Sequence, residues 1–182
     1  MSTTHWDFDK VHSSVNFSVR HLMVSKVRGQ FHDWTGTLVL DDADITRSTV
    51  EVTIQAASID TRDEKRDAHL RSADFFDIEK FPTLAFKSTS VDKISDQELA
   101  IHGDLTIHGI TRPVVLVTEA SGFQKDPWGG TRTGFSAHVS IEREEFGLTW
   151  NAALEAGGVV VGKKVEITLE IEAVQKAAAQ AA

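Results

Sequence analysis

The sequence contains no cysteine, and this absence excludes several kinds of chemistry at once. The chain can form no disulfide, no thiol nucleophile and no thiolate metal site. The absence does not indicate a compartment, because many exported proteins also lack cysteine.

Long apolar runs and an excess of positive charge are also missing. Apolar residues make up 41% of the 182 residues and charged residues 25%, values typical of a soluble globular domain. No run approaches the length of a membrane-spanning helix. The formal net charge is −8, from 19 Lys and Arg against 27 Asp and Glu, which disfavours electrostatic capture of nucleic acid or of an anionic lipid surface. We therefore expect no nucleic-acid partner and no membrane span.

The N-terminal residues bear on targeting. The first residues, MSTTHWDFDK, have neither the basic region nor the apolar run of a secretory signal, so we expect a cytoplasmic protein. The length suits one domain, which we place over residues 1–175. Residues 176–182, at the end of AVQKAAAQAA, are expected to form a flexible Ala-rich tail, because so short a segment is not a stable helix by itself.

The dominant pattern is alternation of apolar and polar residues with a period of two. In SSVNFSVR the apolar residues are Val15, Phe17 and Val19, and the pattern recurs eight times along the chain. Such segments are typical of strands with one buried face. Most connections between them are short, which predicts antiparallel neighbours.

A change of frame marks the second of these segments. Its inward frame shifts between Phe31 and Trp34, which predicts a bulge near His32 and Asp33 that bends the sheet toward closure. Closing the sheet also removes exposed edges. The sequence therefore predicts an all-β fold, an eight-stranded antiparallel barrel whose interior is either filled by side chains or holds one small ligand.

A charged segment separates the third strand from the fourth. Thr61 and Glu64 match a capping box, which predicts a helix from Arg62 to about Ala73. Its apolar stripe is thin, which suits a helix lying across a barrel end rather than inside a core. The aromatic and aliphatic residues expected to anchor the following chain are Phe75, Phe76, Ile78 and Phe81.

Four blocks of the sequence, in this order, carry a family resemblance. They are HSSVNFSVRHLMVSKVRGQF, RDAHLRSADFFDIEKFPTLAFKST, GDLTIHGITRPVVL and FGLTWNAALEAGGVVVGKKVEITLEIEA. Together they resemble the YceI-like family of bacterial lipid- or polyisoprenoid-binding proteins, over roughly Trp6 to Val174. The resemblance implies an extended lipocalin-like barrel with a short helix after the third strand, often as a homodimer. It also implies a long apolar pore that holds one isoprenoid chain, such as a polyprenyl phosphate or quinone tail, for transport, storage or isoprenoid quinone metabolism.

The residues expected to contact such a chain face inward on the strands or lie in the long loop REEFGLTWNAALEAGG. The pore candidates are Val15, Phe17, Val19, Phe31, Trp34, Val52, Ile54, Phe86, Leu105, Ile107, Phe135, Phe146, Trp150 and Leu169. The strand positions among them would equally build a solid core. The loop is expected to form a wall or gate of the pore, or else to tuck under the barrel.

A headgroup site is expected near the segment HLMVSK. Arg20, His21 and Arg28 flank it, and a short helical turn there would present donors to a phosphate or quinone carbonyl. The alternative is that these residues are exposed surface charges.

Signals for catalysis and metal binding are weak. His102, Asp104 and His108 share the outward face of one strand but do not converge, so we expect no metal and no cofactor besides a bound lipid. No G-x-S-x-G motif occurs, and the alternation places no titratable group inward. We expect a binding protein rather than an enzyme. The alternatives are an enzyme on a lipocalin-like barrel, with His21 or a carboxylate at the barrel mouth as base, and a ligand-free barrel with a filled lumen that acts in stress response or interaction.

Overall fold

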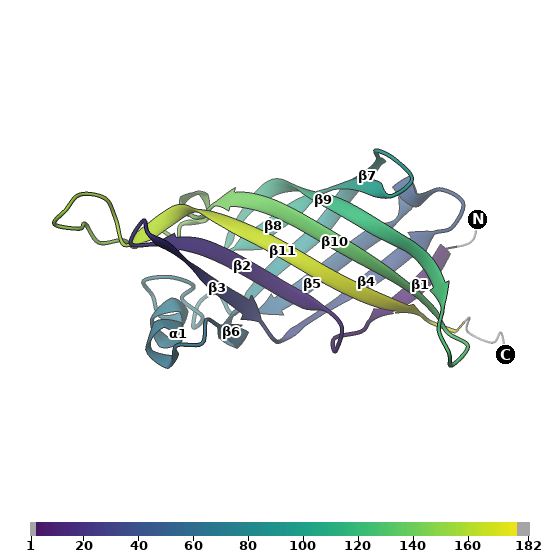
Figure 1. Cartoon of the computed structure of the whole chain (residues 1–182), viewed down its shortest axis with the longest axis horizontal. Coiled ribbons are helices and arrows are strands. Elements are labelled where there is room, and N and C mark those ends of the chain that lie inside the picture. The colour runs from purple at the N-terminus through teal and green to yellow at the C-terminus, as the bar shows by residue number, and fades with distance from the viewer. Residues whose placement is uncertain (1–2, 178–182) are drawn as a thin grey trace.

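The computed structural model describes residues 3–177, which form an elongated antiparallel barrel (Figure 1). The prediction of a flexible tail falls largely on residues 178–182, which lie outside the described part. Within that part, eleven strands form one sheet. They are β1 Thr3–Phe8, β2 Ser14–His21, β3 Ser25–Phe31, β4 Trp34–Asp41, β5 Thr49–Gln55, β6 Ile59–Asp60, β7 Thr83–Lys93, β8 Glu98–Ile107, β9 Ile110–Lys125, β10 Thr131–Glu142 and β11 Val161–Gln175.

The eleven strands occupy eight positions, because three positions are interrupted. β1 and β2 share one position, since β11 pairs with β2 along one half and with β1 along the other. β3 and β4 share the second, and β5 and β6 share the third. The pairing of β1 with β11 closes the ring through β4, β5, β7, β8, β9 and β10. The predicted eight-stranded antiparallel barrel is confirmed.

One interruption falls where the alternation of inward and outward residues shifts by one position in the sequence. β3 ends at Phe31 and β4 begins at Trp34, so the break falls at the predicted His32 and Asp33. The first strand position starts earlier than expected, because Thr3–Phe8 pairs with both β4 and β11. Extra residues in one strand increase its twist and curvature, which helps a sheet to close.

The α-helix α1, Glu64–Arg71, follows the third strand position, as predicted. Its cap differs from the prediction. Asp63 is the N-cap and accepts a hydrogen bond from the Arg66 amide, while the Thr61 hydroxyl donates to buried Asp67. The predicted capping box was wrong, because Thr61 precedes the N-cap. Its side chain holds the first turn of the helix through Asp67.

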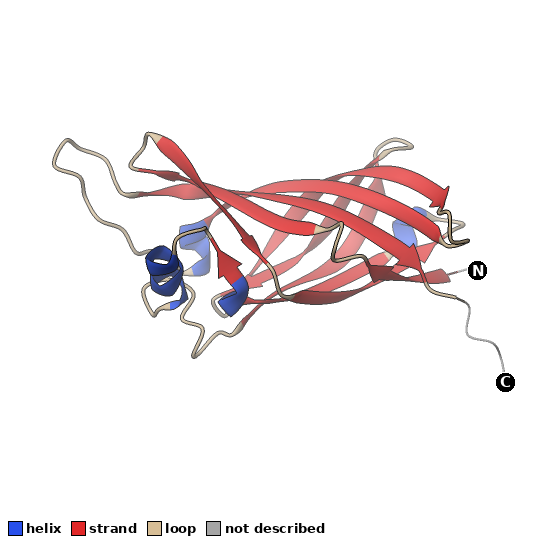
Figure 2. Cartoon of the chain, turned by 60° about the horizontal axis from the view of Figure 1, so that its bottom comes forward, coloured by secondary structure: helices blue, strands red, loops and turns tan. Residues whose placement is uncertain are grey.

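The two ends of the barrel differ (Figure 2). α1 and the loop that precedes β11 lie at one end, and the start of β1 and the end of β11 lie at the other. Three short 3₁₀ helices complete the described elements: η1 Ile45–Arg47, η2 Ala56–Ser58 and η3 Arg143–Phe146. No helix within residues 3–177 has the length and apolar character needed to cross a membrane.

Candidate functional site: an apolar cavity along the barrel

The inward faces of the strands enclose a cavity of about 250 Å³. It extends along much of the barrel, since its wall includes Leu40 and Ile45 toward one end and Leu148 and Val161 toward the other. Alternation explains the wall, because every second residue of each strand points inward. Twelve of the fourteen predicted pore residues line it: Val15, Phe17, Val19, Phe31, Trp34, Val52, Ile54, Phe86, Leu105, Ile107, Phe135 and Leu169.

Two glycines keep large rings close to the wall. Gly29 stands directly opposite Phe17 in the β2–β3 ladder, and the ring covers the place where a Cβ of residue 29 would stand. Gly103 pairs with Ser88 in the β7–β8 ladder, and the ring of Phe86 covers the place where its Cβ would stand. A side chain at either position would displace the ring, and the free direction is the lumen. These glycines therefore help to leave the cavity open.

The wall is almost entirely apolar. Of the forty residues that line the cavity, thirty-five are apolar, and the remaining five are Asn16, Ser48, Thr49, Thr118 and Arg143. Most of these five have their polar groups occupied. Asn16 donates to the Ser14 hydroxyl, Ser48 accepts from the Asp41 amide, and Thr118 donates to the Leu116 carbonyl. The cavity therefore offers shape and apolar surface rather than directed polar contacts.

Arg143 is an inward charge that the sequence pattern did not reveal. Val139 and Ile141 point into the cavity from β10, and Arg143, two residues further along and one past the end of the strand, points the same way. Extending the alternation by one step would have identified it in the sequence. The side chain is buried, and burial lowers its pKa from the ordinary value although Glu144 opposes this shift. The expectation of no inward titratable group was wrong at this position.

The guanidinium of Arg143 acts on the backbone. Nε donates to the Gly162 carbonyl at 2.7 Å, and Nη1 donates to the Leu148 and Trp150 carbonyls at 2.6 and 3.0 Å. The Leu148 and Trp150 carbonyls lie at the start of the loop between η3 and β11, and the Gly162 carbonyl lies just past its end, in β11. Arg143 therefore closes the base of this loop and has no geometry for acid or base chemistry, because an arginine in this setting only donates.

The remaining two predicted pore residues do not line the cavity. Phe146 is 1% exposed and packs in the main core. Trp150 lies outside, with its ring 4.7 Å from His69 and 5.3 Å from Phe75 between centroids. The loop thus packs on the α1 region, while its residue Leu148 contributes to the cavity wall.

The predicted headgroup residues lie outside the cavity wall. Arg20 and Arg28 are exposed and His21 is half-buried, on the hairpin of β2 and β3. The connection between the strands is a two-residue β-turn, with the Val24 amide donating to the His21 carbonyl at 3.1 Å. The expected helical turn was wrong, so no helix terminus is present there to bind an anion.

A polar cluster supports the break between β1 and β2. Ligand atoms of Asp9, His12 and Glu172 lie within 4.8 Å of one another, but the cation among the carboxylates is Arg132. Nη1 of Arg132 donates to Asp9 at 2.7 Å and to Glu172 at 2.5 Å. The hydrogen bond from Arg132, followed by that from His12, lowers the pKa of Asp9 to about 2, and the bond to Asp9 raises the pKa of His12. The cluster is a structural ion-pair network.

The fold and the cavity define an extended lipocalin-like barrel with an apolar interior. The YceI-like domain model matches residues 6–173, and the chain belongs to this family. It is 40% identical to the protein YceI of Salmonella newport over 170 residues, which cover 93% of this chain and 85% of the relative.

Solved structures show the same architecture. The YCEI protein of Campylobacter jejuni matches with a TM-score of 0.75 and 32% identity, covering 93% of this chain and 96% of that one. A polyisoprenoid binding domain from Saccharophagus degradans matches with a TM-score of 0.69 and 12% identity, covering 94% of this chain and 98% of that one. At 12% identity the second comparison shows the common fold alone.

Proposed function

We propose that this protein binds one long isoprenoid chain in the barrel cavity, as a carrier or store for a polyprenyl lipid or quinone tail. The observation that carries the proposal is the continuous apolar wall, in which the polar groups of Asn16, Ser48, Thr118 and Arg143 are already bonded within the protein. The polyisoprenoid-binding function of the Saccharophagus degradans domain, which shares the fold, supports it.

The size of the cavity favours a slender ligand. Its volume of about 250 Å³ lies just below the range of about 300–1,000 Å³ typical of small-molecule sites. Because the wall extends along much of the barrel, a single extended chain fits it better than a bulky polycyclic molecule. The cavity also argues against the alternative of a ligand-free barrel, which requires a completely filled lumen.

Chain length should control the affinity. Burying the five carbons of one isoprene unit yields roughly 3–4 kcal/mol gross, at about 0.8 kcal/mol per carbon, so a few units outweigh the cost of association. The described cavity wall carries no histidine or carboxylate to serve as a general base, which favours binding over catalysis.

A titration with prenyl alcohols of increasing length tests the proposal. We expect the affinity to rise with each unit until the cavity is full, and to be lower for an unbranched alcohol of equal carbon number. Leu105→Trp fills the lumen opposite Phe86 and should weaken binding about tenfold. Asp104→Trp adds the same ring to the outward face of β8 and serves as the control. No uptake of any prenyl alcohol, or equal binding by both variants, would contradict the proposal.

A further inference from the structure

The tip of the β2–β3 hairpin exposes three consecutive apolar residues. Leu22, Met23 and Val24 are 42%, 63% and 82% exposed. Leu22 and Met23 occupy the two central positions of the turn with φ of 51° and 57°. Two positive φ angles with an i to i+3 hydrogen bond define a type I′ turn, which strongly favours Asn-Gly at these positions.

The residue types at this tip oppose its backbone conformation. The turn between β8 and β9 also has two central residues with positive φ, and there the second is Gly109. Leucine and methionine gain nothing from a left-handed conformation, and Met23 remains 63% exposed in it. The folded chain alone gives no reason for them, which points to a partner outside it.

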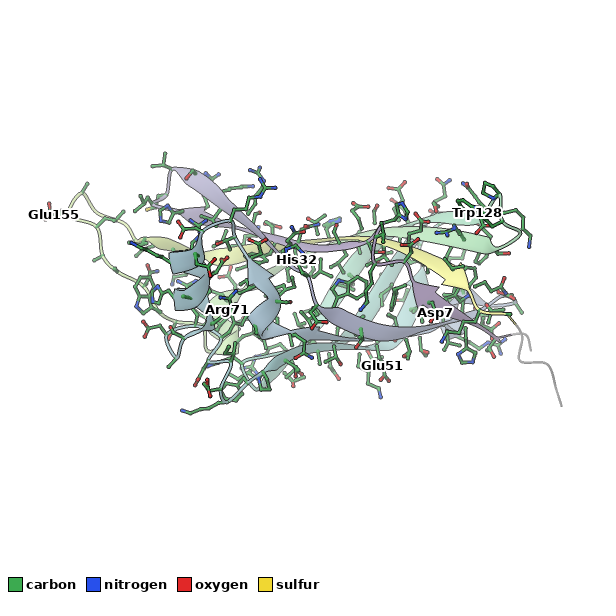
Figure 3. All side chains as sticks on the ribbon, turned by 90° about the horizontal axis from the view of Figure 1, so that it is seen from below. Asp7, His32, Glu51, Arg71, Trp128 and Glu155 are labelled. Carbon is green, nitrogen blue, oxygen red and sulfur yellow. The ribbon has the colours of Figure 1, made fainter. Side chains whose placement is uncertain are left out.

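A second apolar segment lies beside the hairpin tip. The Leu22 amide donates to the Val160 carbonyl at 2.8 Å, and Met23 lies against Gly158. Both contacts are with the loop between η3 and β11, which projects beyond the barrel with Ala152, Ala153, Leu154 and Ala156 near its end. Glu155, at the outermost point in Figure 3, is the one acidic residue from Trp150 to Val160.

Basic side chains surround this tip on the outer face of the hairpin. Arg20 stands directly opposite Lys26, and Arg28 lies on the same face. Like charges in directly opposed positions destabilise a sheet. Among residues 3–177 none of the three forms an ion pair within 4.0 Å, whereas Lys163 and Lys164 of β11 pair with Glu144 and Glu166. Lys26 and Arg28 also lie on the part of β3 that has no strand beside it, since only Gln30 and Phe31 of β3 pair with β6. Charges on such a free strand edge discourage pairing with the edge strand of another molecule.

We propose that this tip, residues 20–28 with residues 152–160, docks the barrel on the surface of a bilayer rich in anionic lipids. The exposed apolar residues would enter the interfacial region, and the unpaired cations would contact lipid phosphates. Val19 and Val161 stand at the bases of the two segments and line the cavity, so docking brings this end of the cavity to the membrane. The net charge of −8 argues against general attraction to such a surface, so the attraction would come from the local cations at this end.

The opposite end of the barrel offers a rival patch. Trp128 is 83% exposed, and Phe123 stacks on Trp6. Arg132 lies under the Trp128 ring, but its charge is already shared by Asp9, Asp126 and Glu172. The local excess of carboxylates would be repelled by anionic lipid, so this end is a suitable control.

Cosedimentation with vesicles of phosphatidylglycerol and phosphatidylcholine tests the docking surface. We expect binding that weakens with added salt and falls strongly on pure phosphatidylcholine vesicles. The double variant Leu22→Asn, Met23→Gly places the favoured residues in the turn, so it should lose binding while its melting temperature is unchanged or higher. Lys26→Gln with Arg28→Gln should weaken binding about thirtyfold, since each of the two cations contributes about 1 kcal/mol near the surface. Glu155→Gln should strengthen it.

Two control variants and sedimentation velocity locate the contact. Trp128→Ser should bind vesicles normally, and its loss of binding would move the contact to the other end. Leu105→Trp should also bind normally, so failure of the cavity proposal would be distinguishable from failure of this one. Absence of binding to anionic vesicles, or equal binding by the Asn-Gly variant, would overturn the proposal. Sedimentation velocity gives a second test. A dimeric parent and a monomeric Asn-Gly variant would show that the tip mediates a dimer instead, and would also overturn the proposal.

Discussion

Phe17 lies directly opposite Gly29 across the β2–β3 ladder, and its ring occupies the space above the glycine. The atoms that an added Cβ would meet belong to the side chains of Phe17 and Thr61 rather than to backbone. The pair can therefore accept a methyl group if the ring moves toward the lumen. The width of the cavity at this point therefore depends on residue 29 having a hydrogen atom in place of a side chain.

Gly29→Ala should narrow the cavity without unfolding the barrel. The displaced Phe17 ring would reduce ligand contact by about 1 kcal/mol, which corresponds to about a fivefold loss of prenyl-alcohol affinity. Titration of the variant measures this loss. Gly134→Ala, on the outward face of β10 beside Ser121, is the matched control and should bind normally. Equal affinities of the two variants would show that Phe17 does not set the width.

Arg143→Lys should loosen the loop between η3 and β11. An ammonium group cannot reproduce the planar fork that serves the carbonyls of Leu148, Trp150 and Gly162, so buried carbonyls would lose their donors. We expect a loss of about 2 kcal/mol in the free energy of unfolding. Hydrogen exchange should become faster for amides of residues 148–162. Arg112→Lys, at an exposed arginine that bonds only the neighbouring Thr111 carbonyl, should change neither quantity.

Trp150→Ala should speed the exchange of bound lipid. The ring packs on His69 and Phe75, and these contacts hold the loop against the α1 region. If the loop gates the cavity, releasing it should raise the rate of lipid transfer to acceptor vesicles severalfold while the equilibrium affinity changes little. Trp128→Ala is the control at the other end. An unchanged transfer rate would assign Trp150 to loop packing only.

Arg132→Gln should destabilise the protein in a pH-dependent way. Removing the guanidinium leaves Asp9, Asp126 and Glu172 close together without their cation, so the variant should unfold at a lower denaturant concentration than the parent near pH 7. The pKa of Asp9 is lowered from 3.8 to about 2, so its contribution is present above the unfolded pKa and is lost as the pH falls toward 2. Denaturant unfolding at pH 7 and pH 3 should therefore show a smaller difference between variant and parent at the lower pH. A difference independent of pH would contradict the ion-pair account.

Much of the barrel could be predicted from the sequence, because strand faces follow a local pattern. The alternation around Phe17 and Leu105 identified the wall, and the frame shift at His32 and Asp33 located a break. β1 was missed because Thr3–Phe8 is a short segment held by distant pairing with β4 and β11. Local sequence contains little information on such long-range contacts.

The errors in the site have equally specific causes. Alternation along the strands did not reveal Arg143, because this residue lies one position past the end of β10, where the inward frame continues. The Leu22–Met23 turn was interpreted as helical because neither residue is typical of a tight hairpin turn. Phe146 and Trp150 are both predicted pore residues of the long loop, but the loop has no continuous helix that would place both on one face.

Organic extraction of the gently purified protein, followed by mass spectrometry, tests the central claim most directly. A sample denatured by heat and refolded is the control, because it has released any ligand bound during expression. The account predicts a near-stoichiometric polyprenyl or quinone species in the native sample that is absent from the control. A native sample without lipid that also fails to take up added prenyl lipids would contradict it.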